Sequence, residues 1–157
     1  MIAWRICKKK RLTTALNGQG AADFPGRWNI KGQFVAYLGE SRALASLEVL
    51  AHAEDRSLLN NVDWVAIPIE FDEDLVTELS PLPEGWDAVP SSLSATAAGC
   101  DWYLSKKSVL LRVPSVVVKG EFNYVLNASH QDAGKVVIGT AEPFSFDPRI
   151  AREPSAG

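Results

Sequence analysis

Residues 26–52 read GRWNIKGQFVAYLGESRALASLEVLAH, and this stretch decides the fold because it predicts a loop, a strand and a helix in direct succession. The segment from Gly26 to Gly32 is rich in glycine and polar residues, which is typical of a loop. Gln33–Leu38 (QFVAYL) reads as a strand. Ser41 is a good N-cap, and the alanine-, leucine- and glutamate-rich segment 42–53 that follows it favours a helix.

The rest of the chain predicts short strands around one more helix. Ser91–Leu104 is the second expected helix, and Lys8–Leu16 is a helix start or a turn. Pro114 interrupts an apolar run and so predicts an edge strand or a bulge there. The expected strands cover residues 2–7, 62–71, 75–79, 109–118, 121–127, 135–139 and 142–146. This order indicates an α+β fold, not a regular strand–helix alternation.

Composition narrows the class of protein. The chain has 157 residues, which favours one domain over residues 1–150, and we expect 151–157 to form a disordered tail. A formal net charge of −3 makes the whole chain a poor match for nucleic acid. The one basic run, Lys8–Arg11, is interpreted as a solvated face.

Several classes of site and location are disfavoured by the absence of their signals. Cys7 and Cys100 make no disulfide framework and predict reduced thiols in a cytoplasmic protein. The N-terminus lacks the apolar core of a signal peptide, and no apolar run is long enough for a membrane span. His52 and His130 stand outside metal-ligand spacings, so no metal site is expected. The chain also has neither GxSxG nor a strand followed by GxGxxG.

Glu48 is the most informative single position. On a helical wheel it falls beside Leu44 on an apolar face formed with Leu47 and Ala51. A carboxylate on an apolar stripe needs a partner or serves a purpose. A salt bridge at the edge of the stripe, or a side chain that extends to solvent, is the structural alternative to a functional role.

Arg27, Tyr37, Ser115 and Asn127 are further candidates, each with an ordinary structural alternative. Arg27 suits phosphate binding but is also consistent with a plain loop arginine. Tyr37 shares a strand face with Val35, and a tyrosine in such a place is more often a core residue than a platform for a ligand. Ser115 follows Pro114, where a bulge can redirect a side chain. Asn127, like Asn123, is compatible with a turn-forming role.

Two segments of this chain resemble the signatures of the RES domain family. The first is GRWNIKGQFVAYLGESRALASLEVLAH, residues 26–52, and the second is LLRVPSVVVKGEFNYVLNASH, residues 110–130. The arginine, glutamate and serine that name the family match Arg27, Glu48 and Ser115. WRI near the N-terminus and LPEGWDAVP match more loosely. The chain departs from the family at Ala128, where a proline commonly follows the asparagine, and in the unusually apolar ATAAGCDW segment.

The resemblance implies a fold, an activity and a partner. RES proteins are toxins of bacterial type II toxin–antitoxin pairs with a fold similar to ADP-ribosyltransferases, a split and twisted mixed sheet with flanking helices. The partner it implies is an Xre-like antitoxin that covers the active site in a heteromeric complex. NAD is implied as the substrate, with no further cofactor or metal, no membrane and no direct nucleic-acid contact.

The same resemblance implies roles for the candidate residues. Glu48 would stabilise positive charge on the ribose or hold its hydroxyl, Arg27 would bind the pyrophosphate, and Tyr37 would stack on nicotinamide. Ser115 would hydrogen-bond the nicotinamide amide or the ribose, with support from Asn127. Transfer of ADP-ribose to a protein is the favoured reaction. Hydrolysis or phosphorolysis of NAD is the alternative, and a non-enzymatic binding module or an RNase is a distant one.

Overall fold

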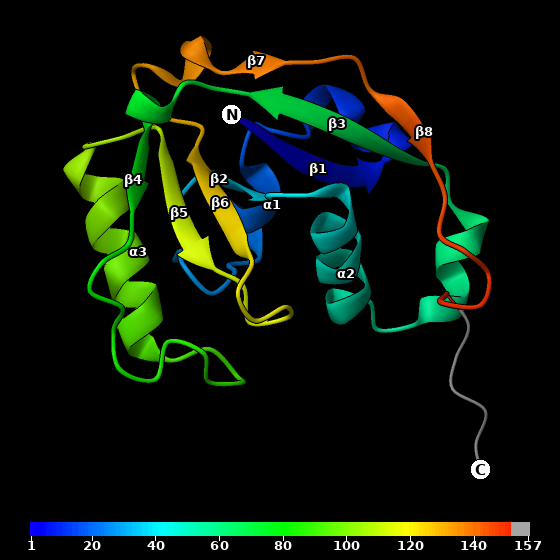
Figure 1. Cartoon of the computed structure of the whole chain (residues 1–157), viewed down its shortest axis with the longest axis horizontal. Coiled ribbons are helices and arrows are strands. Elements are labelled where there is room, and N and C mark those ends of the chain that lie inside the picture. The colour runs from blue at the N-terminus through cyan, green and yellow to red at the C-terminus, as the bar shows by residue number, and fades with distance from the viewer. Residues whose placement is uncertain (152–157) are drawn as a thin grey trace.

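A computed structural model describes residues 1–151 of the chain as a mixed sheet with helices packed on it (Figure 1). The strand order is β4-β5-β6-β2-β1-β3-β7, and β8 pairs with the other part of β3. The strands are β1 (Ile2–Lys8), β2 (Val35–Gly39), β3 (Trp64–Glu70), β4 (Val76–Glu78), β5 (Leu110–Pro114), β6 (Phe122–Asn127), β7 (Val137–Ile138) and β8 (Glu142–Phe144). Only β4 and β5 pair in parallel within the described residues, so the predicted α+β fold with a mixed sheet is confirmed.

The described residues form three α-helices and four short 3₁₀ helices. The α-helices are α1 (Gln19–Asp23), α2 (Arg42–His52) and α3 (Leu93–Ser105), and the 3₁₀ turns are η1 (Lys9–Thr14), η2 (Arg56–Asn61), η3 (Glu73–Leu75) and η4 (Ala133–Lys135). The predicted helices after Ser41 and Ser91 are both present. Within the described residues, none of the helices has the length and apolar character needed to cross a membrane.

The sheet consists of two halves that meet at a single point. Strand β1 pairs with β3 along its whole length, from Ile2↔Glu70 to Lys8↔Trp64. By contrast, β1 and β2 share one register pair, Trp4↔Gly39. We call this junction the split. It separates the half made of β4, β5, β6 and β2 from the half made of β1, β3, β7 and β8.

Helices α2 and α3 cover the same face of the sheet, one on each half. Ala95 and Trp102 of α3 pack with buried side chains of β2, β5 and β6. Ala45 and Leu50 of α2 pack with side chains of β1 and β3. Trp4 packs with the cluster under α2, and Gly39 lies on the same strand face as Val35 and Tyr37 of the cluster under α3. Because paired residues of antiparallel strands point to the same side, the pair Trp4↔Gly39 places both clusters on one face. Figure 1 shows the two helices at separate positions with the split between them.

The opposite face holds the largest buried cluster. Its members include Leu38, Ile67, Ile69, Leu110 and Leu126, which alternate with the residues of the first face. Partly buried residues of the segments around Leu16 and Val136 pack against this cluster. The sheet is therefore covered on both sides, and α2 and α3 lie on the same face, one on each half.

Two local predictions need correction or comment. Strand β5 lies between β4 and β6, so it is not an edge strand. Pro114 is tolerated because it is the last residue of β5, beyond the final β4 pair Glu78↔Arg112. Of the predicted tail, Ala151 is buried among the α2 cluster, and residues 152–157 lie outside the described residues.

Candidate active site

Helix α2 places Glu48 beside the split because the helix begins at Arg42, shortly after strand β2 ends at Gly39. The Ser41 hydroxyl caps the helix by accepting a hydrogen bond from the Leu44 amide at 3.0 Å. A Cβ atom at Gly39 would lie only 2.7 Å from the Ala45 nitrogen, so only glycine permits this close approach. Glu48 lies about one helical turn after Ala45 and so faces the neighbouring half of the sheet.

The Glu48 carboxylate is held by two neutral donors from that neighbouring half. The Ser115 hydroxyl donates to Oε1 at 3.0 Å, and the Asn123 side-chain amide donates to the same oxygen at 2.6 Å. Oε2 has no hydrogen-bond partner among residues 1–151. The carboxylate is therefore fixed through one oxygen, and the other oxygen is left for a ligand.

The helical wheel predicted the wrong buried face of α2, and the structure shows which groups pair with the Glu48 carboxylate. Leu47 is 40% exposed and Ala51 is exposed, whereas Leu44, Ala45 and Leu50 form the buried side of α2. The arc that faces the sheet is thus rotated relative to the predicted one. Glu48 lies half-buried at its border, and the partners found for its carboxylate are a hydroxyl and an amide.

Ser115 is held in the turn that follows β5. Its hydroxyl oxygen accepts hydrogen bonds from the amides of Val117 and Val118, each at 3.1 Å, while its proton goes to Glu48. A hydroxyl has one donor and two acceptor positions, so its capacity is used in full within the chain. The structure therefore brings Ser115 to Glu48 in the position of a support for the carboxylate, and the predicted contact of Ser115 with NAD stays a prediction.

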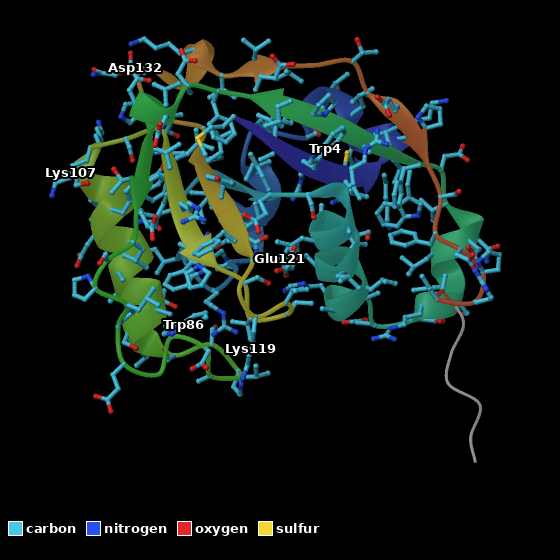
Figure 2. The ribbon with its side chains drawn as sticks, in the orientation of Figure 1. Trp4, Trp86, Lys107, Lys119, Glu121 and Asp132 are labelled. Carbon is cyan, nitrogen blue, oxygen red and sulfur yellow. The ribbon has the colours of Figure 1, made fainter. Side chains whose placement is uncertain are left out.

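Arg27 joins its own loop to the loop that precedes α3. Its Nη1 donates to the carbonyl oxygens of Trp86 and Ala88, both at 2.7 Å. The rings of Trp28 and Trp86 stack with centroids 6.4 Å apart. Figure 2 shows Trp86 on that loop, near the start of α3. Nη2 and Nε of Arg27 have no partner among the described residues, so they remain available to an anion.

Tyr37 is tied to the Arg27 loop through Asn29. The Tyr37 hydroxyl donates to Asn29 Oδ1 at 2.8 Å and accepts from the Trp28 amide at 3.1 Å. Burial raises the pKa of Tyr37 well above its usual value, so the phenol stays protonated. A Cβ at Gly26 would lie 2.8 Å from the Tyr37 ring, which shows that the loop lies against that ring.

Arg5 on β1 is a buried charged residue beside the split that the sequence analysis did not single out. Its Nη1 donates to the Tyr37 carbonyl oxygen at 3.0 Å, across the split where β1 and β2 no longer pair. Its Nε is buried and has no partner among residues 1–151. Burial lowers the pKa of this guanidinium. The available signal was a single arginine inside the otherwise apolar strand IAWRIC.

Asn127 does not join the other candidates. It ends β6, four residues after Asn123, which corresponds to about 13 Å along a strand. Its Oδ1 accepts from the Ser129 amide at 3.0 Å, and the residue is 2% exposed. The structural alternative of a turn-forming asparagine describes its place. Its predicted contact with NAD stays a prediction.

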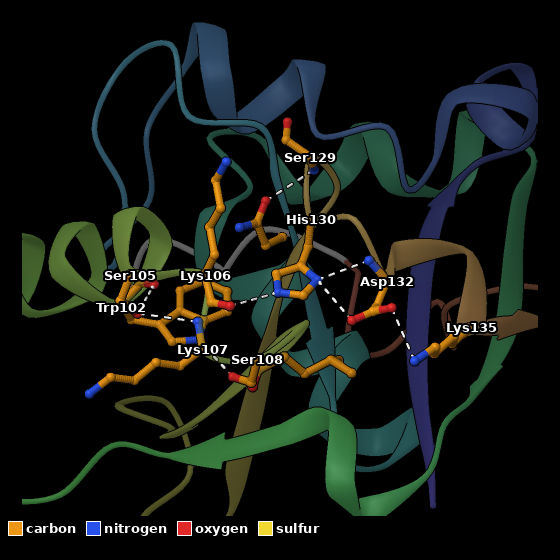
Figure 3. Close-up of polar contacts among 11 residues, drawn as sticks. Trp102, Ser105, Lys106, Lys107, Ser108, Ser129, His130, Asp132 and Lys135 are labelled. Atoms are coloured by element: carbon orange, nitrogen blue, oxygen red, sulfur yellow. Dashed lines mark hydrogen bonds and ion pairs between the residues drawn. The ribbon is translucent and has the colours of Figure 1, made fainter.

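The far end of β6 has a separate polar cluster around His130 (Figure 3). His130 Nδ1 accepts from the Asp132 amide at 3.0 Å, so Nε2 carries the proton and donates to the Lys106 carbonyl oxygen at 2.9 Å. Lys106 is the C-cap of α3 and adopts a left-handed conformation. The imidazole therefore fastens the end of α3 to the turn after β6, away from Glu48.

The loop between β5 and β6 carries further charge. Figure 2 shows Glu121 between the start of β6 and α2, with Lys119 farther out on the same loop. The candidate residues thus include the fixed carboxylate of Glu48, the guanidinium groups of Arg5 and Arg27, and the aromatic ring of Tyr37. Such a set suits a ligand with phosphate, sugar and aromatic parts.

Comparison with known proteins gives close relatives over nearly the whole chain. It is 37% identical to a Sphingobium protein named Prs ADP-ribosylating toxin, over 96% of each chain. It is 34% identical to a Yersinia enterocolitica protein named Toxin Res, over 96% of this chain and 99% of that one.

The fold also matches a solved structure. One chain of the crystal structure of the M. tuberculosis MbcT-MbcA toxin–antitoxin complex superposes with a TM-score of 0.73 at 20% identity, covering 96% of this chain and 86% of that chain. The model of the RES domain matches residues 2–147. The chain therefore belongs to the RES domain family.

Proposed function

We propose that this chain is the toxin of a bacterial toxin–antitoxin pair and that it transfers ADP-ribose from NAD to a protein acceptor. The observation that carries the proposal is the Glu48 carboxylate, held at Oε1 by two donors and free at Oε2, at the split of the sheet. The relatives named Toxin Res and Prs ADP-ribosylating toxin support it, because each aligns with nearly the whole chain.

The chemistry requires a negative charge beside the ribose. Cleavage of the bond between the ribose C1′ and the nicotinamide nitrogen sends the electron pair to the ring, and neutral nicotinamide leaves. Positive charge then develops on the sugar, and the fixed Glu48 carboxylate stabilises it without reorganising. The acceptor forms the new bond at C1′ and loses its proton.

The other side chains would hold the two ends of NAD. The unpartnered Nη2 and Nε of Arg27 would bind the pyrophosphate, and the Tyr37 ring would stack on nicotinamide. Ser115 would act mainly by holding Glu48, since its hydrogen-bonding capacity is used within the chain. Arg5, with a buried Nε that lacks a partner, would add positive charge at the split.

Hydrolysis or phosphorolysis of NAD is the second candidate reaction. It uses the same site and differs only in the acceptor, which would be water or phosphate. The free Oε2 of Glu48 favours this candidate as well, because a carboxylate oxygen can orient a water molecule for attack. In that case the toxin would act by depleting cellular NAD.

We further propose an antitoxin partner that covers the split. The structural likeness to a chain of a toxin–antitoxin complex supports a heteromeric assembly. An Xre-like protein that blocks entry of NAD would silence the enzyme. Coexpression should restore growth and give a copurifying complex, and separation of the two proteins should release NAD turnover.

Incubation of the purified chain with NAD tests the reaction. Protein labelling in a bacterial lysate supplied with tagged NAD supports transfer, whereas free nicotinamide from NAD alone supports hydrolysis, or phosphorolysis if phosphate is required. Glu48→Gln should lower the yield of either product by about 10²- to 10³-fold, and Glu54→Gln, at an exposed glutamate just after α2, should not. If the wild-type protein neither releases nicotinamide nor labels protein, the proposed function is wrong.

A further inference from the structure

The side-chain amide of Asn123 is only half satisfied. Its Nδ2 donates to Glu48 Oε1 at 2.6 Å, the shorter of the two hydrogen bonds that hold this carboxylate. Its Oδ1 is buried and has no partner among residues 1–151. A buried acceptor without a donor costs free energy, so its persistence beside a carboxylate needs an explanation.

Ser115 provides the contrast on the same carboxylate oxygen. Its hydroxyl makes three hydrogen bonds within the chain, to Glu48 and from the amides of Val117 and Val118. It has nothing left to offer a ligand. Asn123 therefore holds the polar atom that remains unsatisfied, although Ser115 is the residue that the family signature emphasises.

The strand neighbours of Asn123 determine the face of the sheet on which its amide lies. Its register partners are Gly39 on β2 and Val113 on β5. Gly39 has no side chain, and the backbone of α2 at Ala45 fills the space above it. Asn123 thus lies on the face of the sheet that carries Glu48, so a molecule bound against the Glu48 carboxylate would also meet this amide.

We propose that Asn123 is a positioning and substrate-binding residue. Its Nδ2 would orient Glu48 so that Oε2 faces the substrate, and its Oδ1 would accept a hydrogen bond from a hydroxyl of the nicotinamide ribose. This inference rests on the proposed use of NAD. It assigns to Asn123 the direct contact that the resemblance alone would assign to Ser115.

The first test is the pH profile of Asn123→Asp. The substitution keeps the shape but replaces the donor by a second carboxylate, and two carboxylates in contact raise the pKa of the pair. Because the reaction needs ionised Glu48, the acidic limb of the rate profile should move up by about one pH unit or more. Activity should recover toward high pH.

Asn60→Asp is the matched control for that test. Asn60 is exposed on η2, so the variant adds the same charge away from the split and should keep the wild-type profile. Glu121, two positions before Asn123 in the sequence, is present in all these proteins and cannot cause a difference between them. An unshifted Asn123→Asp profile in an active, folded protein would overturn the positioning role.

The second test uses Asn123→Ala and two NAD analogues. Wild-type protein should discriminate against NAD whose nicotinamide ribose lacks its 2′-hydroxyl, and this discrimination should weaken by about tenfold in Asn123→Ala, the loss of one hydrogen bond to the substrate. Nicotinic acid adenine dinucleotide, which lacks the carboxamide donor, should be discriminated equally by both proteins. A change confined to this second analogue, or no change with either, would overturn the ribose contact.

The outcomes separate this inference from the proposed function. Failure of wild-type protein to use NAD under any condition removes both. Wild-type turnover with unaltered Asn123 variants removes only the inference. If circular dichroism shows that Asn123→Asp does not fold, Asn123→Ala decides the positioning role by its kcat, which should fall with the misorientation of Glu48.

Discussion

Two polar clusters beside the split, one around Tyr37 and one around Glu48, differ in how far their polar groups are paired, and we call them the Tyr37 side and the Glu48 side of the site. On the Tyr37 side, Asn29 is 1% exposed, and its amide makes four hydrogen bonds, with Gly26, Tyr37, Ala21 and Ile30. On the Glu48 side, Oε2 of the carboxylate and Oδ1 of Asn123 have no partner among residues 1–151.

This difference distinguishes residues that support the fold from residues that are suited to take part in the reaction. A buried network in which every group is paired makes one arrangement rigid, and it offers little to a ligand. Groups that are held in place but left partly unpaired are suited to bind a substrate. We therefore expect changes on the Tyr37 side to act mainly on stability and changes on the Glu48 side to act mainly on NAD turnover.

The largest expected effect is that of Glu48→Gln on turnover. It should lower the rate of NAD consumption by about 10²- to 10³-fold, because the charge that stabilises the transition state is lost. The free energy of unfolding should change little, since a glutamine still offers an oxygen to Ser115 and Asn123. Nicotinamide release and urea denaturation measure the two quantities, and a large loss of stability would contradict the contrast.

Asn29→Ala should act mainly on stability, in contrast to Glu48→Gln. It removes four hydrogen bonds and leaves buried partners unpaired, so the free energy of unfolding should fall by about 2–4 kcal/mol. Urea denaturation measures this change. Asn60→Ala, at an exposed asparagine, serves as the control and should be close to neutral. Equal stability of Asn29→Ala and wild type would show that the network is not a support.

Ser115→Ala sharpens the division on the Glu48 side. Asn123 still holds Oε1 in this variant, so turnover should fall only by about tenfold, the equivalent of one hydrogen bond. Steady-state kinetics should show the loss mainly in kcat, because the serine hydroxyl has no free position for substrate. Ser129→Ala, at an exposed serine, should match the wild type. A loss confined to KM would instead indicate a direct contact with NAD.

Tyr37→Phe should have the smallest effect, about 1 kcal/mol of stability. Its signature is pH dependence. The pKa of Tyr37 is raised by burial, so its contribution to stability is fully present below the unfolded value of about 10 and is lost as pH rises above that value. Denaturation curves at alkaline pH should show a shallower loss of stability for the phenylalanine variant. Parallel curves for the two proteins would contradict this.

Local signals account for the elements that were predicted well. The Ser41 cap and the composition after it determine α2, and alternation determines β2 with Val35 and Tyr37 on one face. The exposed positions of Leu47 and Ala51 could not be read from the wheel, because the buried arc depends on how close α2 approaches Gly39. That approach depends on tertiary packing, which a helical wheel does not include.

The sequence proposed candidate residues for the site but could not give their contacts. Family signatures located Arg27, Glu48 and Ser115, but the carbonyl partners of Arg27 lie about 60 positions away in sequence, at Trp86 and Ala88. Arg5 gains its meaning only from the failure of β1 and β2 to pair beyond Trp4. Asn123 resembled an ordinary turn residue until its amide was placed beside Glu48.

The single register pair between β1 and β2 has a thermodynamic consequence. Few contacts join the two halves there, and the hydrogen bonds of Glu48 and Arg5 cross the same junction. A molecule that spans the junction binds the folded chain and not the unfolded one, so its free energy of binding adds to stability by linkage. The melting temperature should therefore rise with the logarithm of the concentration of any inhibitor or antitoxin that bridges both halves.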